Sequence, residues 1–291
     1  MPTCLTGAAL PWGFSNVCGL AGIFTPRSRA PEAPNMDAML RIMHHRGPDG
    51  QSTWARPDGL FRTGFVRLAI IDLQTGDQPI VEDGGARVLL GNGEIYNYQE
   101  LRREEPDYPF KTDGDMETVL ATSRHGERFV DRLNGMFALA LYERDAHQLL
   151  LVRDRLGVKP MYWAHTPGGS ILFASEIKAI FASGLVAPEI DEAAVSAYLG
   201  HGFVPGPATL FKGINKLMPG HAMEIDATGD IRHQRYWRPQ APDDMPADGP
   251  GIEAYLTELL SDSVRLQLRS DVPVGALLSG GLDSGLMVAL A

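Results

Sequence analysis

The feature that most constrains the fold is a pair of apolar runs joined by a short polar turn. Residues 137–142 and 149–152 are almost continuously apolar, and residues 143–147 between them are polar. Such runs are typical of strands buried on both faces, and a short turn joins antiparallel neighbours. A second hairpin is expected from residues 161–164 and 171–174. Hairpins recur through residues 18–180 with few helices between them, which predicts an α+β fold of antiparallel sheets covered by helices.

Other segments of this region have weaker patterns. Met36, Met39, Leu40 and Met43 recur at helical spacing and predict a short amphipathic helix. Residues 65–72 and 87–90 are expected to be strands, residues 116–120 begin a helix capped from Asp113-Gly114-Asp115, and residues 192–199 form a helix that Gly200 ends. Residues 1–17 contain no charged residue and show no period, so we expect a tail there.

The pattern changes after residues 241–251, which contain three prolines, three aspartates and two glycines and are expected to be a linker. A helical period runs from Ile252 to Leu268. Residues 272–278 are then expected to be a strand, followed by a glycine-rich loop and the start of a helix. This order opens a parallel α/β domain. Because one strand cannot complete such a domain, we expect residues 252–291 to be its truncated start and the chain to be the N-terminal portion of a longer protein.

Composition excludes several classes of protein. The 291 residues include 36 acidic and 26 basic side chains, a net charge of −10, with no basic block. We therefore expect no nucleic-acid or membrane partner. The two cysteines, Cys4 and Cys18, imply no disulfide framework, and no apolar run approaches the ~20 residues of a membrane span. These features favour a cytoplasmic protein.

The loop at residues 279–284 has the sequence Ser-Gly-Gly-Leu-Asp-Ser between the expected strand and helix. Glycine amides, the two serine hydroxyls and a helix N-terminus suit an anion. With no lysine in the loop, Asp283 would face a magnesium ion, so the loop is interpreted as a pyrophosphate–Mg²⁺ cradle. The alternative is a plain strand–turn–helix junction.

Four segments near the N-terminus carry candidate chemistry. Cys18 heads a short apolar run, Cys18-Gly-Leu-Ala-Gly-Ile-Phe, and is a candidate nucleophile. Asn92 and the amide of Gly93 can form an oxyanion hole, or alternatively a type I′ turn. Arg67 lies in an apolar strand and suits a carboxylate, or alternatively a structural ion pair. Glu94 and Asp115 also have structural alternatives: Glu94 as a solvated side chain, and Asp115 as a helix cap.

Together these segments resemble one family, the glutamine-hydrolysing asparagine synthetases. The resemblance runs from Cys18 to the last residue and rests on motifs in a fixed order: the Cys18 segment, His45-Arg-Gly-Pro-Asp, Arg67-Leu-Ala-Ile-Ile-Asp, Asn92-Gly-Glu-Ile-Tyr-Asn, Thr112-Asp-Gly-Asp, Leu133-Asn-Gly-Met-Phe-Ala, Arg153-Asp-Arg-Leu-Gly-Val-Lys-Pro, Ala174-Ser-Glu-Ile-Lys-Ala and Ser279-Gly-Gly-Leu-Asp-Ser. It implies a class II glutamine amidotransferase domain over residues 18–240, folded as a four-layer αββα N-terminal-nucleophile sandwich. It also implies the start of an ATP-pyrophosphatase domain.

The resemblance implies roles at the glutamine site. Cys18 would attack the glutamine amide with its own α-amine as general base, and Asn92 and Gly93 would hold the oxyanion. Arg67 would bind the glutamine α-carboxylate, and Glu94 and Asp115 its α-ammonium. His45, Arg46, Asp49, Arg153, Asp154 and Lys159 are assigned to a supporting ion-pair network.

The implied ligase makes asparagine from aspartate, glutamine and ATP, releasing AMP and diphosphate. ATP and Mg²⁺ would enter as a substrate complex, with no tightly bound cofactor, and a homodimer is allowed for. The nucleotide and pyrophosphate would be held by residues 277–284, with Asp283 on the metal: Leu277, Leu278, Ser279, Gly280, Gly281, Asp283 and Ser284. The alternatives are an amidotransferase for another carboxylate, or a decayed glutaminase with a structural role.

One departure concerns position 18, since the family begins its mature chain at the cysteine. An amide-linked nitrogen cannot act as base, so the printed chain should be inactive unless the Val17–Cys18 bond is absent. The favoured explanation is a start at residue 17, where an initiating GTG codon would replace valine by a removable methionine. A processed propeptide and an extended inactive domain remain open. Since most of the synthetase half is missing, this piece is expected to hydrolyse glutamine at most.

Overall fold

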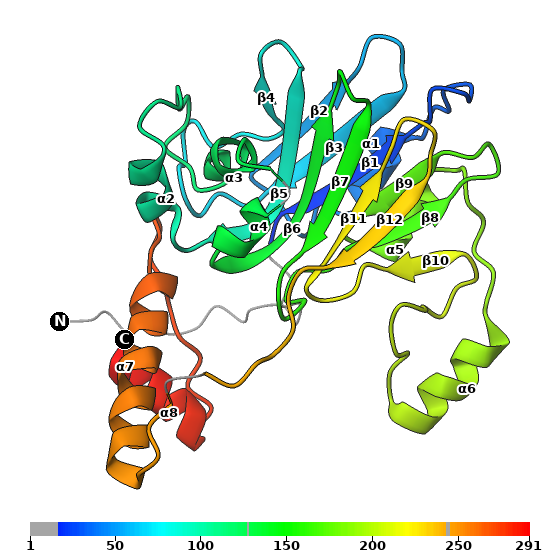
Figure 1. Ribbon diagram of the computed structural model, residues 1–291. Coiled ribbons are helices and arrows are strands. Elements are labelled where there is room, and N and C mark those ends of the chain that lie inside the picture. The colour runs from blue at the N-terminus through cyan, green and yellow to red at the C-terminus, as the bar shows by residue number, and fades with distance from the viewer. Residues whose placement is uncertain (1–16, 127, 243–244) are drawn as a thin grey trace.

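Two six-stranded antiparallel sheets face each other at the centre of the structure, a computed structural model that describes residues 17–126, 128–242 and 245–291 (Figure 1). The expected tail therefore lies outside the described residues except for Val17, and so does Cys4. No helix in these ranges is both long and apolar enough to cross a membrane.

The first sheet contains the strand that follows Cys18. Its order is β10-β8-β9-β1-β3-β2. The strands are β1 (Gly19–Phe24), β2 (Gly50–Ala55), β3 (Phe61–Arg67), β8 (Tyr162–His165), β9 (Ile171–Ala174) and β10 (Ile214–Lys216). β1 lies between β3 and β9, so the segment after Cys18 is fixed on both sides.

The second sheet contains the first expected hairpin and the Asn92 segment. Its order is β12-β11-β7-β6-β5-β4. The strands are β4 (Ile80–Glu82), β5 (Arg87–Ile95), β6 (Gly135–Glu143), β7 (Gln148–Arg153), β11 (His221–Ile225) and β12 (Ile231–Arg235). Both expected hairpins, β6–β7 and β8–β9, are confirmed.

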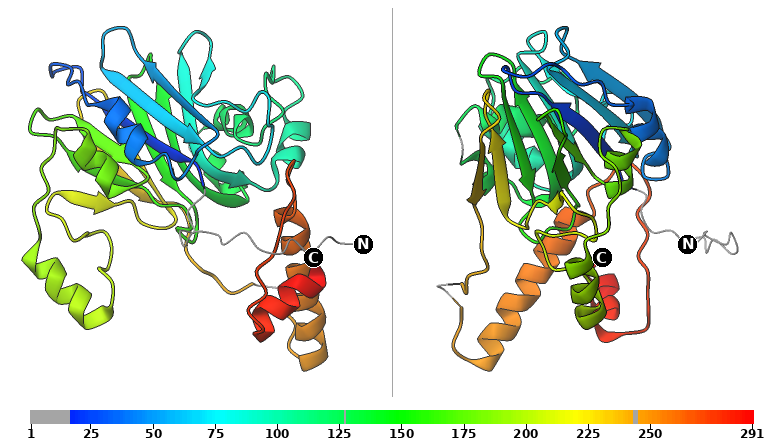
Figure 2. Two further views of the ribbon diagram at one scale, coloured as in Figure 1. Left: turned by 180° about the vertical axis from the view of Figure 1, so that it is seen from behind. Right: turned by 90° about the vertical axis from the view of Figure 1, so that its right-hand side faces the viewer.

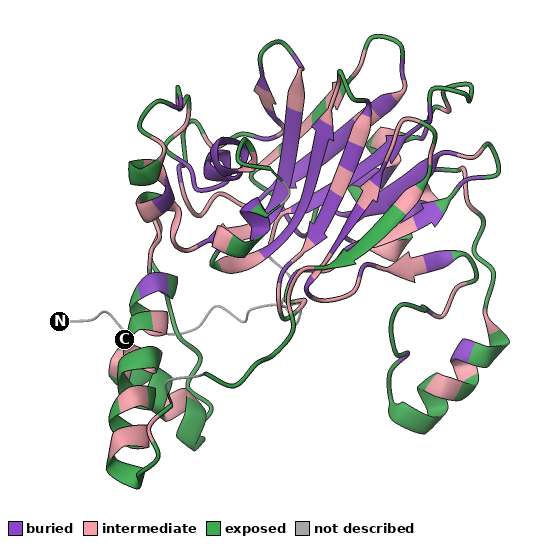
Figure 3. Ribbon diagram, viewed as in Figure 1, coloured by how far each residue is buried: buried purple, intermediate pink, exposed green. Residues whose placement is uncertain are grey.

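The central strands of both sheets, such as β1 and β6, are largely buried on two faces, as the apolar runs predict, whereas the edge strands β2 and β12 are partly exposed (Figure 3). Along β6, Ala138, Ala140 and Tyr142 pack between the sheets. The alternate residues Leu139 and Leu141 pack under helices on the outer face. This alternation follows from the two-residue period of a strand, and it makes β6 a continuous apolar run.

A layer of helices covers the outer face of each sheet, which confirms the αββα sandwich (Figure 2). α1 (Met36–Ile42) and α5 (Ile177–Ala182) pack together over the first sheet. α2 (Tyr98–Glu104), α3 (Glu117–Ser123) and α4 (Phe129–Arg132) cover the second. The expected amphipathic helix is therefore α1, with Met39 and Leu40 fully buried.

Some element ends differ from the sequence-based predictions. α6 (Glu192–His201) ends at Gly202 rather than Gly200, because Gly202 has the left-handed conformation, φ 76°, that ends helices. β3 ends at Arg67, so residues 68–72 form a loop instead of continuing the strand. β5 continues through Asn92-Gly93, which pairs with β6, so the type I′ turn proposed as an alternative there is wrong.

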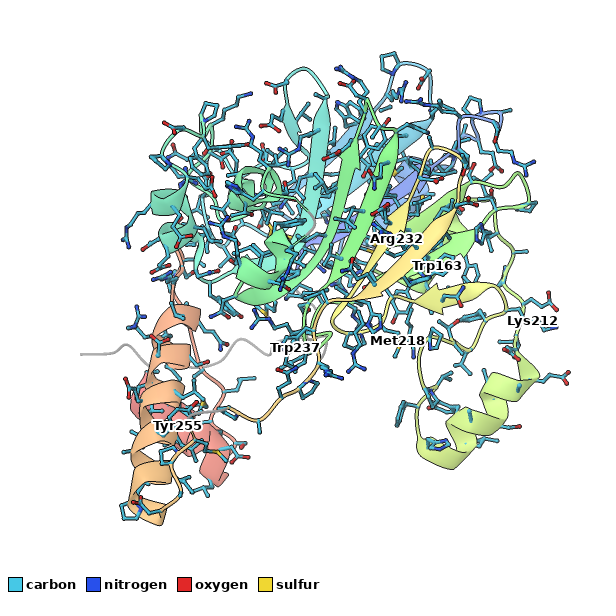
Figure 4. The ribbon with its side chains drawn as sticks, viewed as in Figure 1. Trp163, Lys212, Met218, Arg232, Trp237 and Tyr255 are labelled. Atoms are coloured by element: carbon cyan, nitrogen blue, oxygen red, sulfur yellow. The ribbon has the colours of Figure 1, made fainter. Side chains whose placement is uncertain are left out.

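The last 43 residues, 249–291, here called the second region, form two helices that are largely exposed to solvent. α7 (Gly249–Gln267) is capped by Asp248, so its first turn includes the final residues of the expected linker. α8 (Leu282–Leu290) packs against α7. The strand expected at 272–278 is absent: Pro273 has no N–H to donate, and no described strand pairs with this segment. In Figure 4 Trp237 lies where the chain leaves the sandwich, and Tyr255 lies on α7.

Candidate active site

The Cys18 thiol lies at the start of β1, in a pocket between the two sheets. The pocket is lined by residues from distant segments, including Arg67, Gly93, Glu94 and Asp115. Cys18 Sγ lies 3.4 Å from Leu68 N and 3.5 Å from Leu68 O, within hydrogen-bonding distance of both. Burial raises the pKa of this thiol to about 11. The thiol is therefore protonated at neutral pH, so an attack would need a base to take its proton.

The backbone of Cys18 is held by a buried arginine. Arg46 Nε donates to the Cys18 carbonyl at 3.1 Å, and Arg46 Nη1 pairs with Glu176 at 2.9 Å. His45 and Lys178 contact the same carboxylate. These contacts give His45 and Arg46 the supporting role that the sequence analysis assigns to them.

A second supporting network surrounds Asp154. Among the described residues it consists of hydrogen bonds to backbone groups, not of the ion pairs expected from the sequence. Asp154 accepts backbone hydrogen bonds from Phe137, Leu156, Val158 and Lys159. Arg153 donates to three carbonyls of the neighbouring loop. Both residues thus fix the loop that carries Lys159, whose buried ammonium group has its pKa lowered by loss of solvent.

Asn92 lies on the inner face of β5, although it is not among the residues that line the Cys18 pocket. Asn92 shares its face of β5 with Val88 and Leu90, which pack between the sheets, and Cys18 packs against the same cluster. Asn92 is fully buried, yet neither its Oδ1 nor its Nδ2 has a hydrogen-bond partner. A buried amide without partners costs free energy, which is consistent with a group that binds a ligand.

Gly93 also has a specific geometric requirement. Its φ of 145° disfavours any side chain, and a Cβ there would lie 1.9 Å from the Met136 carbonyl oxygen. The backbone after Asn92 therefore approaches β6 more closely than any other residue type would allow.

Arg67 ends β3 and points into the following loop. Its Nη1 pairs with Asp77 at 2.9 Å, and its Nη2 donates to the carbonyls of Ile71 and Asp72. Asp77 is exposed, so its carboxylate is accessible to exchange with another anion. The ion pair proposed as a structural alternative is therefore present, on a guanidinium that also lines the pocket.

Glu94, which is half-buried, and Asp115, which is buried, place two carboxyl groups on the pocket wall. Burial, followed by the charge of Asp115, raises the pKa of Glu94, and Glu94 Oε2 has no partner. Burial likewise raises the pKa of Asp115, although its Oδ2 accepts from Ile95 N at 2.7 Å. Asp115 therefore does not cap α3 with its side chain, and Glu94 is not solvated. Among the described residues neither carboxyl group forms an ion pair, although the Lys159 charge opposes the rise in the pKa of Glu94. Such a pair of carboxyl groups is suited to an ammonium ligand.

Three groups that shape this pocket are not among the residues predicted from the sequence. The Gln78 side chain forms two hydrogen bonds with the Gly91 backbone: Nε2 donates to the carbonyl at 3.0 Å, and Oε1 accepts from the amide at 2.6 Å. Asp72, with φ 54°, accepts a hydrogen bond from Asp113 N through Oδ2 at 2.9 Å, which connects the loop after Arg67 to the turn before Asp115. Asp271 reaches the same loop from the second region. Polar residues in a loop give no periodic signal, although Asp72 belongs to the Arg67-Leu-Ala-Ile-Ile-Asp motif.

The predicted phosphate loop lies in the second region, and its residues do not line the Cys18 pocket. Ser279 and Ser284 hydroxyls lie 2.8 Å apart across the loop, and Gly280 has φ 82°. Gly281 begins α8 without a side-chain cap. Leu277 and Leu278 are exposed.

Comparison with known proteins agrees with this fold. Two facing antiparallel sheets between helical layers, with a cysteine heading a central strand, define an N-terminal-nucleophile amidotransferase fold. The family model described as "Glutamine amidotransferase domain" matches residues 17–237, and the chain belongs to this family. A second family model, "Asparagine synthase", matches residues 255–291.

Curated relatives include asparagine synthetase [glutamine-hydrolyzing] 1 of Bacillus subtilis, which is 37% identical over 289 residues. Asparagine synthetase B of Escherichia coli is 35% identical over 277 residues. Each alignment covers 94% of this chain and 44% of the relative. The chain thus spans under half the length of these two relatives.

Solved structures share the fold at low sequence identity. A glutamine phosphoribosylpyrophosphate amidotransferase from B. subtilis has a TM-score of 0.55 at 16% identity. The alignment covers 94% of this chain and 63% of that one. A structure titled as the allosteric regulatory enzyme of purine biosynthesis has a TM-score of 0.57, also at 16% identity.

Proposed function

We propose that residues 18–240 hydrolyse glutamine to glutamate and ammonia, with Cys18 as the nucleophile. The observation that carries this proposal is the pocket itself. A thiol, a guanidinium and three carboxyl groups line it, and Asn92, whose buried amide has no hydrogen-bond partner, precedes the lining residue Gly93. Glutamine offers an α-carboxylate to Arg67, an α-ammonium to Glu94 and Asp115, and a side-chain amide to Cys18.

The mechanism follows from the protonated thiol. Cys18 Sγ attacks the amide carbon, and its proton is taken by the α-amine of Cys18 when that amine is free. An α-amine has a pKa of about 7.7–8.0, which suits a base at neutral pH. Asn92 Nδ2 and Gly93 N donate to the developing oxyanion. The α-ammonium of Cys18 then returns the proton to the amide nitrogen, which leaves as ammonia. Water hydrolyses the γ-glutamyl thioester to glutamate and restores the thiol.

We propose that the complete protein uses this ammonia to convert aspartate into asparagine. The named relatives and the match of residues 255–291 support this acceptor. The linker and domain bounds, 241–251 and 252–291, belong to the same proposal, as does a cytoplasmic location. ATP and Mg²⁺ would enter as one substrate complex.

The phosphate loop fits an anion. Gly281 caps α8 without a side chain, so the first amides of this nine-residue helix have no side-chain partner. We therefore assign Ser279, Gly280, Gly281 and Ser284 to the pyrophosphate, and Leu277 and Leu278 to the nucleotide pocket. We assign Asp283, the acidic residue of this loop, to the Mg²⁺ that accompanies the ATP phosphates.

The test compares two forms of the protein, the printed chain and a chain in which Cys18 is the first residue. We expect glutamate and ammonia in equal amounts from the second form, and little from the first because its Cys18 nitrogen is an amide. A Cys18-first chain that leaves glutamine intact would contradict the proposal.

One relative has a name other than asparagine synthetase. Amidase chry2 of Gibberella zeae is 32% identical over 284 residues and covers 92% of this chain. An amidotransferase for a carboxylate other than aspartate is therefore the alternative. Product analysis of the full-length protein with aspartate, ATP and glutamine distinguishes the two, since only a synthetase would release asparagine.

A further inference from the structure

Three residues after α7 connect the second region to the glutamine pocket. Arg269, Ser270 and Asp271, here called the strap, follow the C-terminus of α7 and reach the sandwich beside α2 (Figures 1 and 2). Among the described residues, every hydrogen bond and ion pair between residues 249–291 and the sandwich comes from Arg269 or Asp271.

Asp271 holds the loop that follows Arg67. Its Oδ2 accepts from Asp72 N at 2.7 Å, and its own N–H donates to Ile70 O at 3.0 Å. Asp72 in turn accepts from Arg67 through its carbonyl and from Asp113 N through its carboxylate. Asp271 therefore fixes the residue that positions both Arg67 and the turn before Asp115.

Arg269 holds the turn that follows Glu94. It forms a two-pronged ion pair with Glu100 of α2, with both N–O distances 2.7 Å, and also donates to the Tyr96 carbonyl. Tyr96 lies two residues after Glu94 in the chain. A planar guanidinium with two carboxylate contacts has a defined orientation, so the Tyr96 backbone is fixed as well.

We propose that the strap positions both walls of the glutamine site, so that its docking and glutamine binding favour each other. This inference rests on the proposed glutamine site and adds Arg269 and Asp271 to it as positioning residues. Neither residue lines the pocket. Linkage requires the effect to be reciprocal: bound glutamine should stabilise the docked strap as much as the strap stabilises bound glutamine.

The test measures glutamine affinity in the complete 291-residue chain by calorimetry, which does not depend on turnover. Asp271→Ala and Arg269→Ala should each weaken glutamine binding about tenfold or more, the effect of losing a charge-assisted hydrogen bond. Asp271→Asn should stay within about threefold of the parent, because its amide oxygen can still accept from Asp72 N. Glu100→Arg should restore most of the affinity lost in Arg269→Glu.

The matched control is Arg265→Ala. Arg265 pairs with Asp262 on α7 and lies outside the strap contacts, so its loss removes the same charge without touching the sandwich. We expect parent affinity from this variant. Parent-like glutamine affinity in both alanine variants would overturn the inference.

Amide hydrogen exchange separates this inference from the proposed function. In Asp271→Ala, the amides of Asp72 and Asp113 should exchange at least several-fold faster than in the parent. If the parent binds no glutamine, the proposed function fails, and exchange alone decides whether the strap orders the loops. Unchanged exchange at both amides would contradict the strap's role.

Discussion

The sandwich and the last 43 residues have similar apolar patterns in the sequence but different surroundings in the structure. In the sandwich, strands such as β6 have helices on one side and the other sheet on the opposite side. In the second region Leu277, Leu278 and Leu282 are largely exposed, and only Leu266 of α7 is buried. An apolar run therefore predicts a strand correctly only when the neighbouring elements that bury it are present.

The same difference separates the two proposed sites. The glutamine site is enclosed by packed layers, and this burial raises the pKa values of Cys18, Glu94 and Asp115. The phosphate loop is exposed, and its hydrogen bonds are local, between Ser279, Gly281 and Ser284. The first site is built from distant segments of this chain, whereas the second consists of a loop and a helix end.

The largest expected contrast is in stability. Phe61 is fully buried and stacks on Tyr142, with ring centroids 4.2 Å apart. Phe61→Ala should lower the free energy of unfolding of the sandwich by about 3–5 kcal/mol. Leu282→Ala, at a position 88% exposed, should change it by less than about 0.5 kcal/mol. Denaturant titration followed by tryptophan fluorescence measures both, and equal losses would contradict the contrast.

The next contrast is in catalysis. Asn92→Ala should lower kcat for glutamine hydrolysis about 100- to 1,000-fold, the effect of losing one oxyanion donor, with a smaller change in KM. Asp283→Asn in the phosphate loop should leave glutamine hydrolysis unchanged. Steady-state kinetics of the Cys18-first chain tests both. A rise in KM with kcat unchanged for Asn92→Ala would contradict the oxyanion role, because it would mean that Asn92 binds the ground state and the transition state equally.

The smallest expected effect depends on pH. Burial raises the pKa of Glu94 from its usual 4.5 to about 8, so the folded state holds this proton more tightly than the unfolded chain. Stability from this group is present below about pH 4.5 and is lost as the pH rises to about 8. Glu94→Gln should therefore raise the free energy of unfolding at pH 8.5 by on the order of 1 kcal/mol and change it little at pH 4.5.

Thermal unfolding at the two pH values measures this difference. The control is Glu258→Gln on α7, where the side chain is exposed and no gain is expected at either pH. A Glu94→Gln variant that is less stable than the parent at pH 8.5 would show that the Glu94 carboxylate is stabilised by its surroundings.

The sequence predicts the sandwich well because strand burial has a local signature. Continuous apolar runs identify β6 and β7, and helical spacing identifies α1. The predicted strand at 272–278 is wrong because Pro273 and the absence of a described partner strand outweigh the apolar pattern. Gly202 rather than Gly200 ends α6, since backbone conformation and not residue type alone makes a helix end.

The candidate site is only partly readable in the sequence. The order of the motifs identifies Arg67, Asn92 and Asp115 as site residues. It does not predict that the Asn92 amide has no hydrogen-bond partner or that Asp115 accepts from the Ile95 amide. Asp72 and the strap depend on contacts between segments about 200 residues apart in the chain. No local pattern encodes such contacts, because they arise only when the second region meets the sandwich.

We propose that Cys18 is a glutamine-cleaving nucleophile in a pocket that recognises the whole amino acid. The most direct test is mass spectrometry of the Cys18-first chain after incubation with a diazoketone analogue of glutamine. We predict one adduct, on Cys18, that excess glutamine prevents and that Arg67→Ala strongly slows. Labelling of Cys18 at the same rate with and without glutamine, or in Arg67→Ala as fast as in the parent, would contradict the claim.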